Sequence, residues 1–242
     1  MSRRVHLDVP VPVWRAVTGW IARVRRRPGA RPWQRAASVH AQVVLVLRWL
    51  RHRVDLHTLV REAGISDATA YRYLHEGLEE IAAHAPDLHE VIEQAHEAGV
   101  PFLRLDGTLV PTDRVAARAE AGHDLWYSGK HHRHGGTVQV FADPGGFPLW
   151  VAAVRPGSAR DLTATRELAL PALYLHAARG LPVLADKGYT GAGITVHTPI
   201  KRPPGDAVPH TDTRTCNHLL TACARRPSAP MPCWTTGGRC TG

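Results

Sequence analysis

Apolar residues recur at intervals of three and four over the first third of the chain, the spacing that places them on one face of a helix. Ser38 precedes such a run and is a residue type that caps helix N-termini, so a first helix is predicted to begin there. A second helix is predicted after Asp55 and ends at Gly64, and a third covers residues 67–83. Three short amphipathic helices therefore follow one another closely.

The second and third of these helices, joined by a short turn that contains Gly64, match a helix-turn-helix, whose second helix enters the major groove of DNA. On the outward side of that helix, Thr69 and Arg72 are the candidates for contact with bases or phosphates. Arg72 is the sharper candidate, because a guanidinium can pair with guanine through two hydrogen bonds. A plain helical bundle with a solvated face is the alternative.

From Pro101 onward the pattern changes to short apolar or alternating runs bounded by Gly and Pro, which predicts strands. One more short helix is predicted over residues 86–99, and the domain boundary is expected in the nineties. The other predicted elements are strands over 101–110, 137–142 and 148–154, a helix over 161–178, and strands ending at Asp186 and covering 194–200. This order is that of a ribonuclease H-like α/β domain, a mixed sheet with flanking helices in which the first and fourth strands lie side by side.

Two of the predicted strands each carry one carboxylate. Asp106 lies within a mostly apolar run, and Asp186 ends another. Two adjacent strands that each present one carboxylate can bind a metal ion between them. Carboxylate oxygens are ligands that suit Mg²⁺. The alternative is that Asp106 only caps the turn at Gly107, since Asp-Gly is a common turn pair.

Charge points to a polyanionic partner. The 242 residues include 30 Lys and Arg against 21 Asp and Glu, a formal net charge of +9. Much of the excess lies in residues 1–37, where Arg25, Arg26 and Arg27 form a cluster among Pro and Gly. We expect this segment to be a basic arm that cannot form a continuous helix and that lies along DNA phosphates. A solvated linker or a basic surface without a partner is the alternative.

Five short motifs, in this order, carry a family resemblance. They are Leu105-Asp106-Gly107-Thr108, Tyr127-Ser128-Gly129-Lys130-His131-His132, Ala142-Asp143-Pro144-Gly145-Gly146, Asp161-Leu162-Thr163 and Leu184-Ala185-Asp186-Lys187-Gly188-Tyr189. Together they resemble insertion-sequence transposases of the DDE type, in the Harbinger-like group. The resemblance covers residues 38–222. It implies a helix-turn-helix domain over 38–96 and a ribonuclease H-like catalytic domain over 97–222.

The resemblance also implies roles. Asp106 and Asp186 would be the first two catalytic acids, and a Glu on a helix after the fifth strand would be the third. An intact relative would hold two Mg²⁺ or Mn²⁺ ions, which neutralise charge on the attacking and leaving oxygens during DNA cleavage and strand transfer. The implied partner is double-stranded DNA, the terminal inverted repeats of the element. The protein would be a homo-oligomer when active, in the bacterial cytoplasm with its DNA.

A loop close to the acids is expected to hold DNA phosphates through Lys130, His131, His132 and Arg133. A zinc site made of His131, His132 and His134 is the alternative, although adjacent His rarely point at one ion. Asp161 is interpreted as the cap of the helix that follows it.

The C-terminal sequence departs from the family pattern. No Asp or Glu follows Asp212, and residues 223–242 contain no Leu, Ile or Val but three of the four Cys. We expect an aberrant, disordered tail. Our hypothesis is a frameshift near Ala222, which removes the third acid and impairs catalysis in this copy. A non-catalytic DNA-binding remnant and an unrelated metal-dependent nuclease or regulator are the alternative functions.

Membrane association is not expected. No apolar run reaches the roughly 18 residues of a membrane span, and no signal peptide opens the chain. The sequence therefore predicts a cytoplasmic protein.

Overall fold

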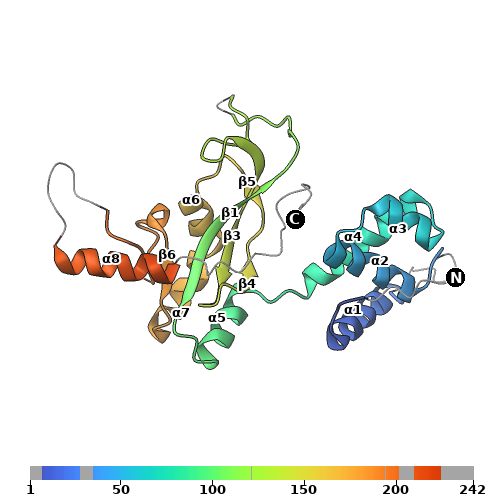
Figure 1. Ribbon diagram of the computed structural model, residues 1–242, viewed down its shortest axis with the longest axis horizontal. Helices are drawn as coiled ribbons and strands as arrows, with labels where there is room; N and C mark the ends of the chain where they lie inside the picture. The colour runs from blue at the N-terminus through green and yellow to red at the C-terminus, as the bar shows by residue number, and fades with distance from the viewer. Residues whose placement is uncertain (1–6, 28–34, 121, 194, 202–209, 225–242) are drawn as a thin grey trace, which may run out of the picture. The chain divides into compact units, whose positions relative to one another are not determined.

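The computed structural model describes residues 7–27, 35–120, 122–193, 195–201 and 210–224 (Figure 1). The chain divides into two compact units, unit 1 from Met1 to Ala85 and unit 2 from Pro86 to Gly242. The division lies earlier than the predicted boundary at residue 96. Helix α5 (Leu88–Glu97) causes the difference, because it buries Leu88 and Ile92 in the core of unit 2.

The described part of unit 1 consists of helices α1 (Val11–Val24), α2 (Val39–His52), α3 (Leu56–Ala63) and α4 (Asp67–Ala83). The predicted bounds and caps of the last three helices are confirmed. Ser38, Asp55 and Ser66 each accept a hydrogen bond from a backbone N–H of the first turn that follows. Gly64 ends α3 at a φ of 64°, a left-handed conformation that glycine adopts without steric cost.

Helix α1 covers part of the predicted N-terminal arm and ends at Val24, before Pro28 and Pro32 of the sequence. It is 14 residues long and buries Val17 and Ile21 against Val43 and Leu47 of α2. The proline in α1 lies in its first turn, where a missing N–H costs no helical hydrogen bond. The described part of the predicted arm is therefore packed onto the helices of unit 1.

Unit 2 is built on a mixed sheet of strands β1 (Leu103–Pro111), β2 (Tyr127–Ser128), β3 (Arg133–Ala142), β4 (Pro148–Val151), β5 (Arg155–Pro156), β6 (Val183–Ala185) and β7 (Val196–His197). The order along the sheet is β2-β3-β1-β6-β7, and β4 and β5 also pair with β3. Strands β1 and β3 are antiparallel, whereas β1, β6 and β7 are parallel. The predicted first and fourth strands, β1 and β6, are thus neighbours, as expected.

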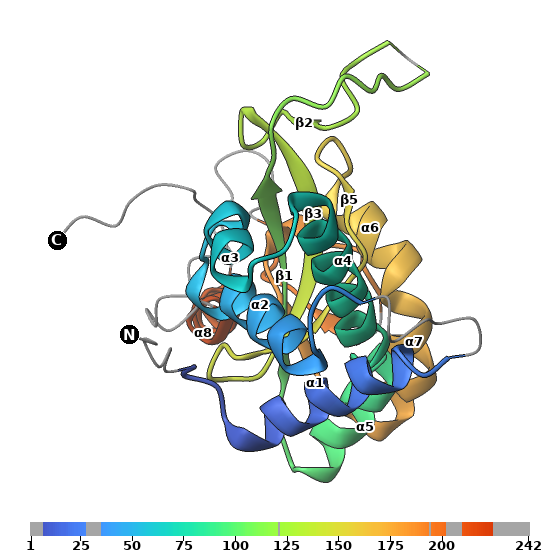
Figure 2. The ribbon, with the colours of Figure 1, turned by 90° about the vertical axis from the view of Figure 1, so that its right-hand side faces the viewer.

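Helices lie on both sides of this sheet. Helices α6 (Asp161–Leu168) and α7 (Leu170–His176) lie along one side and α8 (Thr211–Ala224) along the other (Figure 2). A single helix over 161–178 was predicted. It is divided at Ala169, because Pro171 in the first turn of α7 has no N–H to continue a hydrogen-bond ladder. The core lies between the sheet and helices α5 and α7. None of the described helices is long and apolar enough to cross a membrane.

Candidate active site

The two predicted acids lie at corresponding positions of two neighbouring strands. In the parallel pair β1 and β6, Leu105 is opposite Ala185, and Asp106 and Asp186 are the residues that follow them. Leu105 and Ala185 are buried, while both aspartates are exposed. Since the strands run in the same direction, this register places Asp106 beside Asp186, where β6 ends.

A turn fixes the position of Asp186. Strand β6 ends at Ala185, and a short 3-10 helix, Lys187–Tyr189, follows. Asp186 caps this helix, and its Oδ1 accepts a hydrogen bond of 2.7 Å from the N–H of Gly188. One oxygen of the carboxylate is therefore oriented by the backbone, a feature that the motif Asp-Lys-Gly encodes locally.

A third carboxylate, Asp161, belongs to the same region. The interpretation of Asp161 as a helix cap is wrong, because the cap position of α6 is Arg160 and no side chain caps that end. Asp161 lies instead in the first turn, and its Oδ2 accepts a hydrogen bond of 3.1 Å from the Nζ of Lys130. Gly107, next to Asp106 in β1, leaves the space that the Asp161 carboxylate fills.

The three carboxylates act on two neighbouring groups. The hydrogen bond that Lys130 donates to Asp161 raises the pKa of Lys130, and the charges of Asp186 and Asp106 add to the increase. The pKa of the Tyr189 phenol is also raised, chiefly by burial and then by the charges of all three aspartates. Both groups therefore keep their protons through neutral pH, Lys130 as a cation and Tyr189 as a neutral donor.

A buried network beneath the acids holds Tyr189 in place. Its hydroxyl donates a hydrogen bond of 2.6 Å to Oε1 of Gln139, which also accepts one of 3.1 Å from Thr165. The Gln139 side chain donates in turn to Asp161 at 3.5 Å. Gln139 is a polar residue at a buried position of β3, and this unusual burial is a structural property that the sequence pattern does not reveal.

Lys130, His131 and His132 belong to the turn between β2 and β3, and Arg133 is the first residue of β3. All four residues are exposed. His134, the third residue of the zinc alternative, lies edge-on to the ring of Tyr127. The described residues contain no group of three or more His, Cys, Asp or Glu placed to hold a metal ion.

The residues fit a divalent ion in part. Mg²⁺ is usually bound through one or two carboxylates, several waters and the phosphates of a substrate, which Asp106 and Asp186 together would allow. The third acid implied by the resemblance is a Glu on a helix after the fifth strand, and α8 contains none. The protein thus offers two adjacent, exposed carboxylates at the point where β6 ends.

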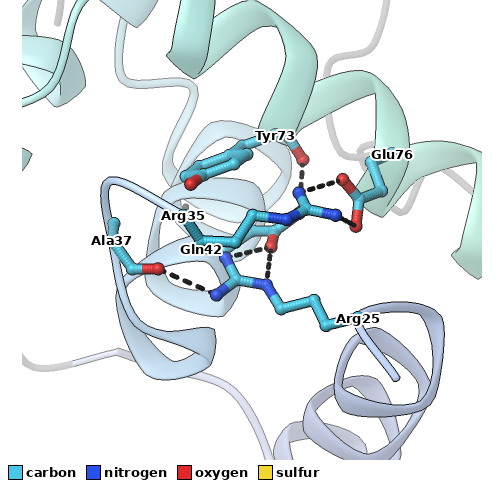
Figure 3. A network of polar contacts seen from close by, with 6 residues as sticks. All are labelled: Arg25, Arg35, Ala37, Gln42, Tyr73 and Glu76. Carbon is cyan, nitrogen blue, oxygen red and sulfur yellow. Dashed lines mark hydrogen bonds and ion pairs between the residues drawn. The ribbon is translucent and has the colours of Figure 1, made fainter. Parts of the chain in front are cut away.

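The structure corrects one candidate DNA contact in unit 1. Arg25 is only 6% exposed. Its guanidinium donates to Oε1 of Gln42 at 2.9 and 2.6 Å and to the carbonyl of Ala37 at 2.8 Å (Figure 3). Gln42 donates onward to the carbonyl of Tyr73. Arg25 therefore joins α1 to α2 and is not placed at the surface to meet a phosphate.

The other candidates in unit 1 lie at or near the surface. Arg26 and Arg72 are exposed, and Arg27 is exposed beside Glu80, with 3.2 Å between Nη2 and Oε2. Thr69 is half-buried, and its hydroxyl accepts a hydrogen bond of 3.0 Å from Ser66 at the start of α4. Among the candidates, Arg26 and Arg72 have the freest access to a phosphate or a base edge.

Substituting Gly107 by Ala should disturb the site and destabilise unit 2. The added Cβ would lie 2.8 Å from Cγ of Asp161 and 2.9 Å from the hydroxyl of Tyr189. We expect a loss of about 1–2 kcal/mol in the unfolding free energy, measured by hydrogen exchange of the β3 amides. Gly129→Ala is the matched control, because nothing lies within 4 Å of its Cβ. Equal exchange rates in the two variants would contradict the placement of Asp161.

Comparison with known protein families identifies the domain that carries this site. The family model described as DDE superfamily endonuclease matches residues 105–225, half of the 242-residue chain. Searches of curated proteins and of solved structures gave no match. DDE superfamily endonucleases typically use divalent metal ions. The match begins at Leu105, directly before Asp106, and includes β6 and Asp186. The chain therefore belongs to the DDE superfamily of endonucleases.

Proposed function

We propose that this protein is a DNA-binding transposase of an insertion sequence, of the Harbinger-like group, with reduced catalytic activity. The observation that carries the proposal is the placement of Asp106 and Asp186 at corresponding positions of adjacent parallel strands. Its substrate would be double-stranded DNA, the terminal inverted repeats of its element, cleaved and joined by a homo-oligomer.

The residues of the site divide the work as follows. Asp106 and Asp186 would hold Mg²⁺ or Mn²⁺, which when bound neutralises charge on the attacking and leaving oxygens of a phosphodiester. Lys130 keeps its proton beside them and is exposed, so its ammonium can bind a phosphate of the substrate strand. Tyr189 and Gln139 keep Asp161, and through it Lys130, in a fixed position.

DNA binding is proposed for unit 1 as well. Helices α3 and α4 follow each other across Gly64 and Ile65 with both N-termini capped, the arrangement of a helix-turn-helix. Thr69 and Arg72 lie in the first two turns of α4, the part of a recognition helix that meets base edges. The formal charge of +9 supports both contacts, because phosphate binding releases counterions.

Impaired catalysis is the finer part of the proposal. Helix α8 supplies no Glu, and the family match ends at residue 225, close to Ala222, where the sequence predicts a change of frame. The residues beyond Ala224 lie outside the described part of the chain. Sequencing the gene tests this idea: a Glu-bearing helix should appear in another frame downstream of codon 222, and its absence from every frame would refute the frameshift.

Plasmid nicking and duplex binding together test the proposed function. We expect the protein to bind a short DNA duplex with an affinity that falls steeply with salt, and to nick supercoiled plasmid slowly in Mn²⁺ but not in EDTA. Salt-dependent binding without nicking would favour the second candidate, a non-catalytic DNA-binding remnant, which the lack of a Glu in α8 supports. Absence of both activities would refute the proposal.

A further inference from the structure

A cavity of about 580 Å³ opens beside the acids in unit 2. Three segments line it: residues 128–131 at the turn between β2 and β3, residues 157–162 at the start of α6, and Gly188 and Thr190 after Asp186. Thr137 of β3 and Lys201 complete the wall. The cavity is larger than a single inorganic phosphate needs and falls in the range of small-ligand sites.

The charges in this cavity favour an anion. Lys130, His131, Arg160 and Lys201 are basic, and Asp161 is the acidic residue among the lining side chains. Asp161 forms an ion pair with Lys130 and therefore does not cancel the charge of Arg160 or Lys201. Both of these side chains belong to exposed residues. A ligand with at least one phosphate would meet Arg160 and Lys201, two cations that the described contacts do not pair with Asp161.

The start of α6 adds to this preference. Arg160 occupies the cap position, no side chain caps this end of the helix, and Asp161 and Leu162 of its first turn line the cavity. Helix N-termini carry partial positive charge and uncapped amides, which bind phosphate oxygens. The cavity thus combines a helix end, with Arg160 at its cap position, and the cation Lys201 from another segment.

The lining offers little for a stacked base. No Phe, Tyr or Trp is among the described residues that line the cavity, and His131 supplies a single small ring. Recognition of an unstacked base normally uses aromatic faces. Hydroxyl groups of Ser128, Ser158 and Thr190 are present instead and can meet sugar and phosphate oxygens.

We infer that this cavity binds the sugar-phosphate backbone of the DNA strand that flanks the cleaved phosphodiester, through Arg160, Lys201 and the first turn of α6. The inference rests on the proposed function, since it assigns the path of the substrate strand at the same site. The DNA strand would run from Asp106 and Asp186 past Gly188 into the cavity. There the protein would contact the sugar-phosphate backbone and not the bases, so binding would not depend on sequence.

Thymidine 3′,5′-bisphosphate, a minimal piece of a DNA strand, tests the inference with the full chain. In NMR titrations, the amide signals of residues 158–162 and 188–190 should shift with the bisphosphate and stay in place with thymidine. Arg160→Ala and Lys201→Ala should each weaken binding by about tenfold, the usual loss for a charged hydrogen bond. Arg114→Ala is the control, an exposed arginine of unit 2 outside the cavity, and should bind as the unchanged protein does.

The two proposals can fail separately. Equal shifts with thymidine, or binding that Arg160→Ala and Lys201→Ala leave unchanged, would overturn the assignment of the cavity even if the protein nicks plasmid DNA. Bisphosphate binding that both variants weaken would support the cavity even if nicking is absent. A second measurement supports it independently: each variant should lower the salt dependence of single-stranded DNA binding by about 0.7 in log–log slope.

Discussion

Asp106→Asn should reduce the proposed Mn²⁺-dependent plasmid nicking by about a thousandfold. Asp106 follows Leu105 in β1, and Asp186 follows the paired residue Ala185 of β6. An amide oxygen is a weaker, neutral ligand, so the loss corresponds to several kcal/mol of transition-state stabilisation. Single-turnover nicking of supercoiled plasmid, followed on agarose gels with and without EDTA, measures the effect.

Binding of duplex DNA separates this role from a structural one. Removing a negative charge from the surface proposed to face DNA phosphates should leave the duplex affinity of Asp106→Asn unchanged or raise it. Asp113→Asn is the control, an exposed aspartate just after β1, and should nick as the unchanged protein does. Nicking that survives Asp106→Asn would show that the cleavage comes from a contaminating nuclease or from other residues.

Local patterns predicted those parts of the fold that local physics determines. Ser38, Asp55 and Ser66 cap helices because their short polar side chains reach nearby backbone N–H groups, which depends on a few residues in sequence. Strands β1, β3, β4, β6 and β7 followed in the same way from runs bounded by Gly and Pro, whereas the two-residue strands β2 and β5 were not predicted. The neighbouring positions of Asp106 and Asp186 required one more step, the strand order of the ribonuclease H-like domain that the succession of elements predicts.

Long-range contacts decided what the sequence could not show. Asp161 has the position and residue type of a helix cap, and only the distant Lys130 and Gln139 reveal that its carboxylate points elsewhere. The cavity next to it is likewise assembled from three segments that are far apart in sequence. The role of a polar residue at the start of an element is therefore better assigned from its contacts in the fold than from the neighbouring sequence.

The roles of the three N-terminal arginines also depend on the fold, and here the expected change in unfolding free energy is larger. Composition alone treats Arg25, Arg26 and Arg27 as equivalent cations. The register of α1 makes them different, since Val17, Ile21 and then Arg25 follow at intervals of four and share the buried face. This spacing is present in the sequence, but the prolines around the segment argued against a helix there.

Arg25→Ala should lower the unfolding free energy of unit 1 by about 2–4 kcal/mol. Burial lowers the pKa of this guanidinium, which shows that it is partly desolvated, and its hydrogen bonds to Gln42 and Ala37 compensate for that cost. Truncation leaves Oε1 of Gln42 and the carbonyl of Ala37 without these donors inside the helical packing. Hydrogen exchange of the α2 amides in the unchanged protein and the variant measures the difference.

Arg26→Ala is the control for Arg25→Ala, because Arg26 is the next residue in sequence and is exposed. Its unfolding free energy should stay within about 0.5 kcal/mol of the unchanged protein, the usual range for surface positions. The effects on DNA should be reversed: Arg26→Ala should lower the salt dependence of duplex binding by about 0.9 in log–log slope, and Arg25→Ala should not lower it while unit 1 stays folded. If Arg25→Ala instead weakened DNA binding without changing exchange of the α2 amides, the guanidinium would have to leave Gln42 and reach a phosphate. The burial of Arg25 opposes that movement, because α1 would have to separate from α2 to release it.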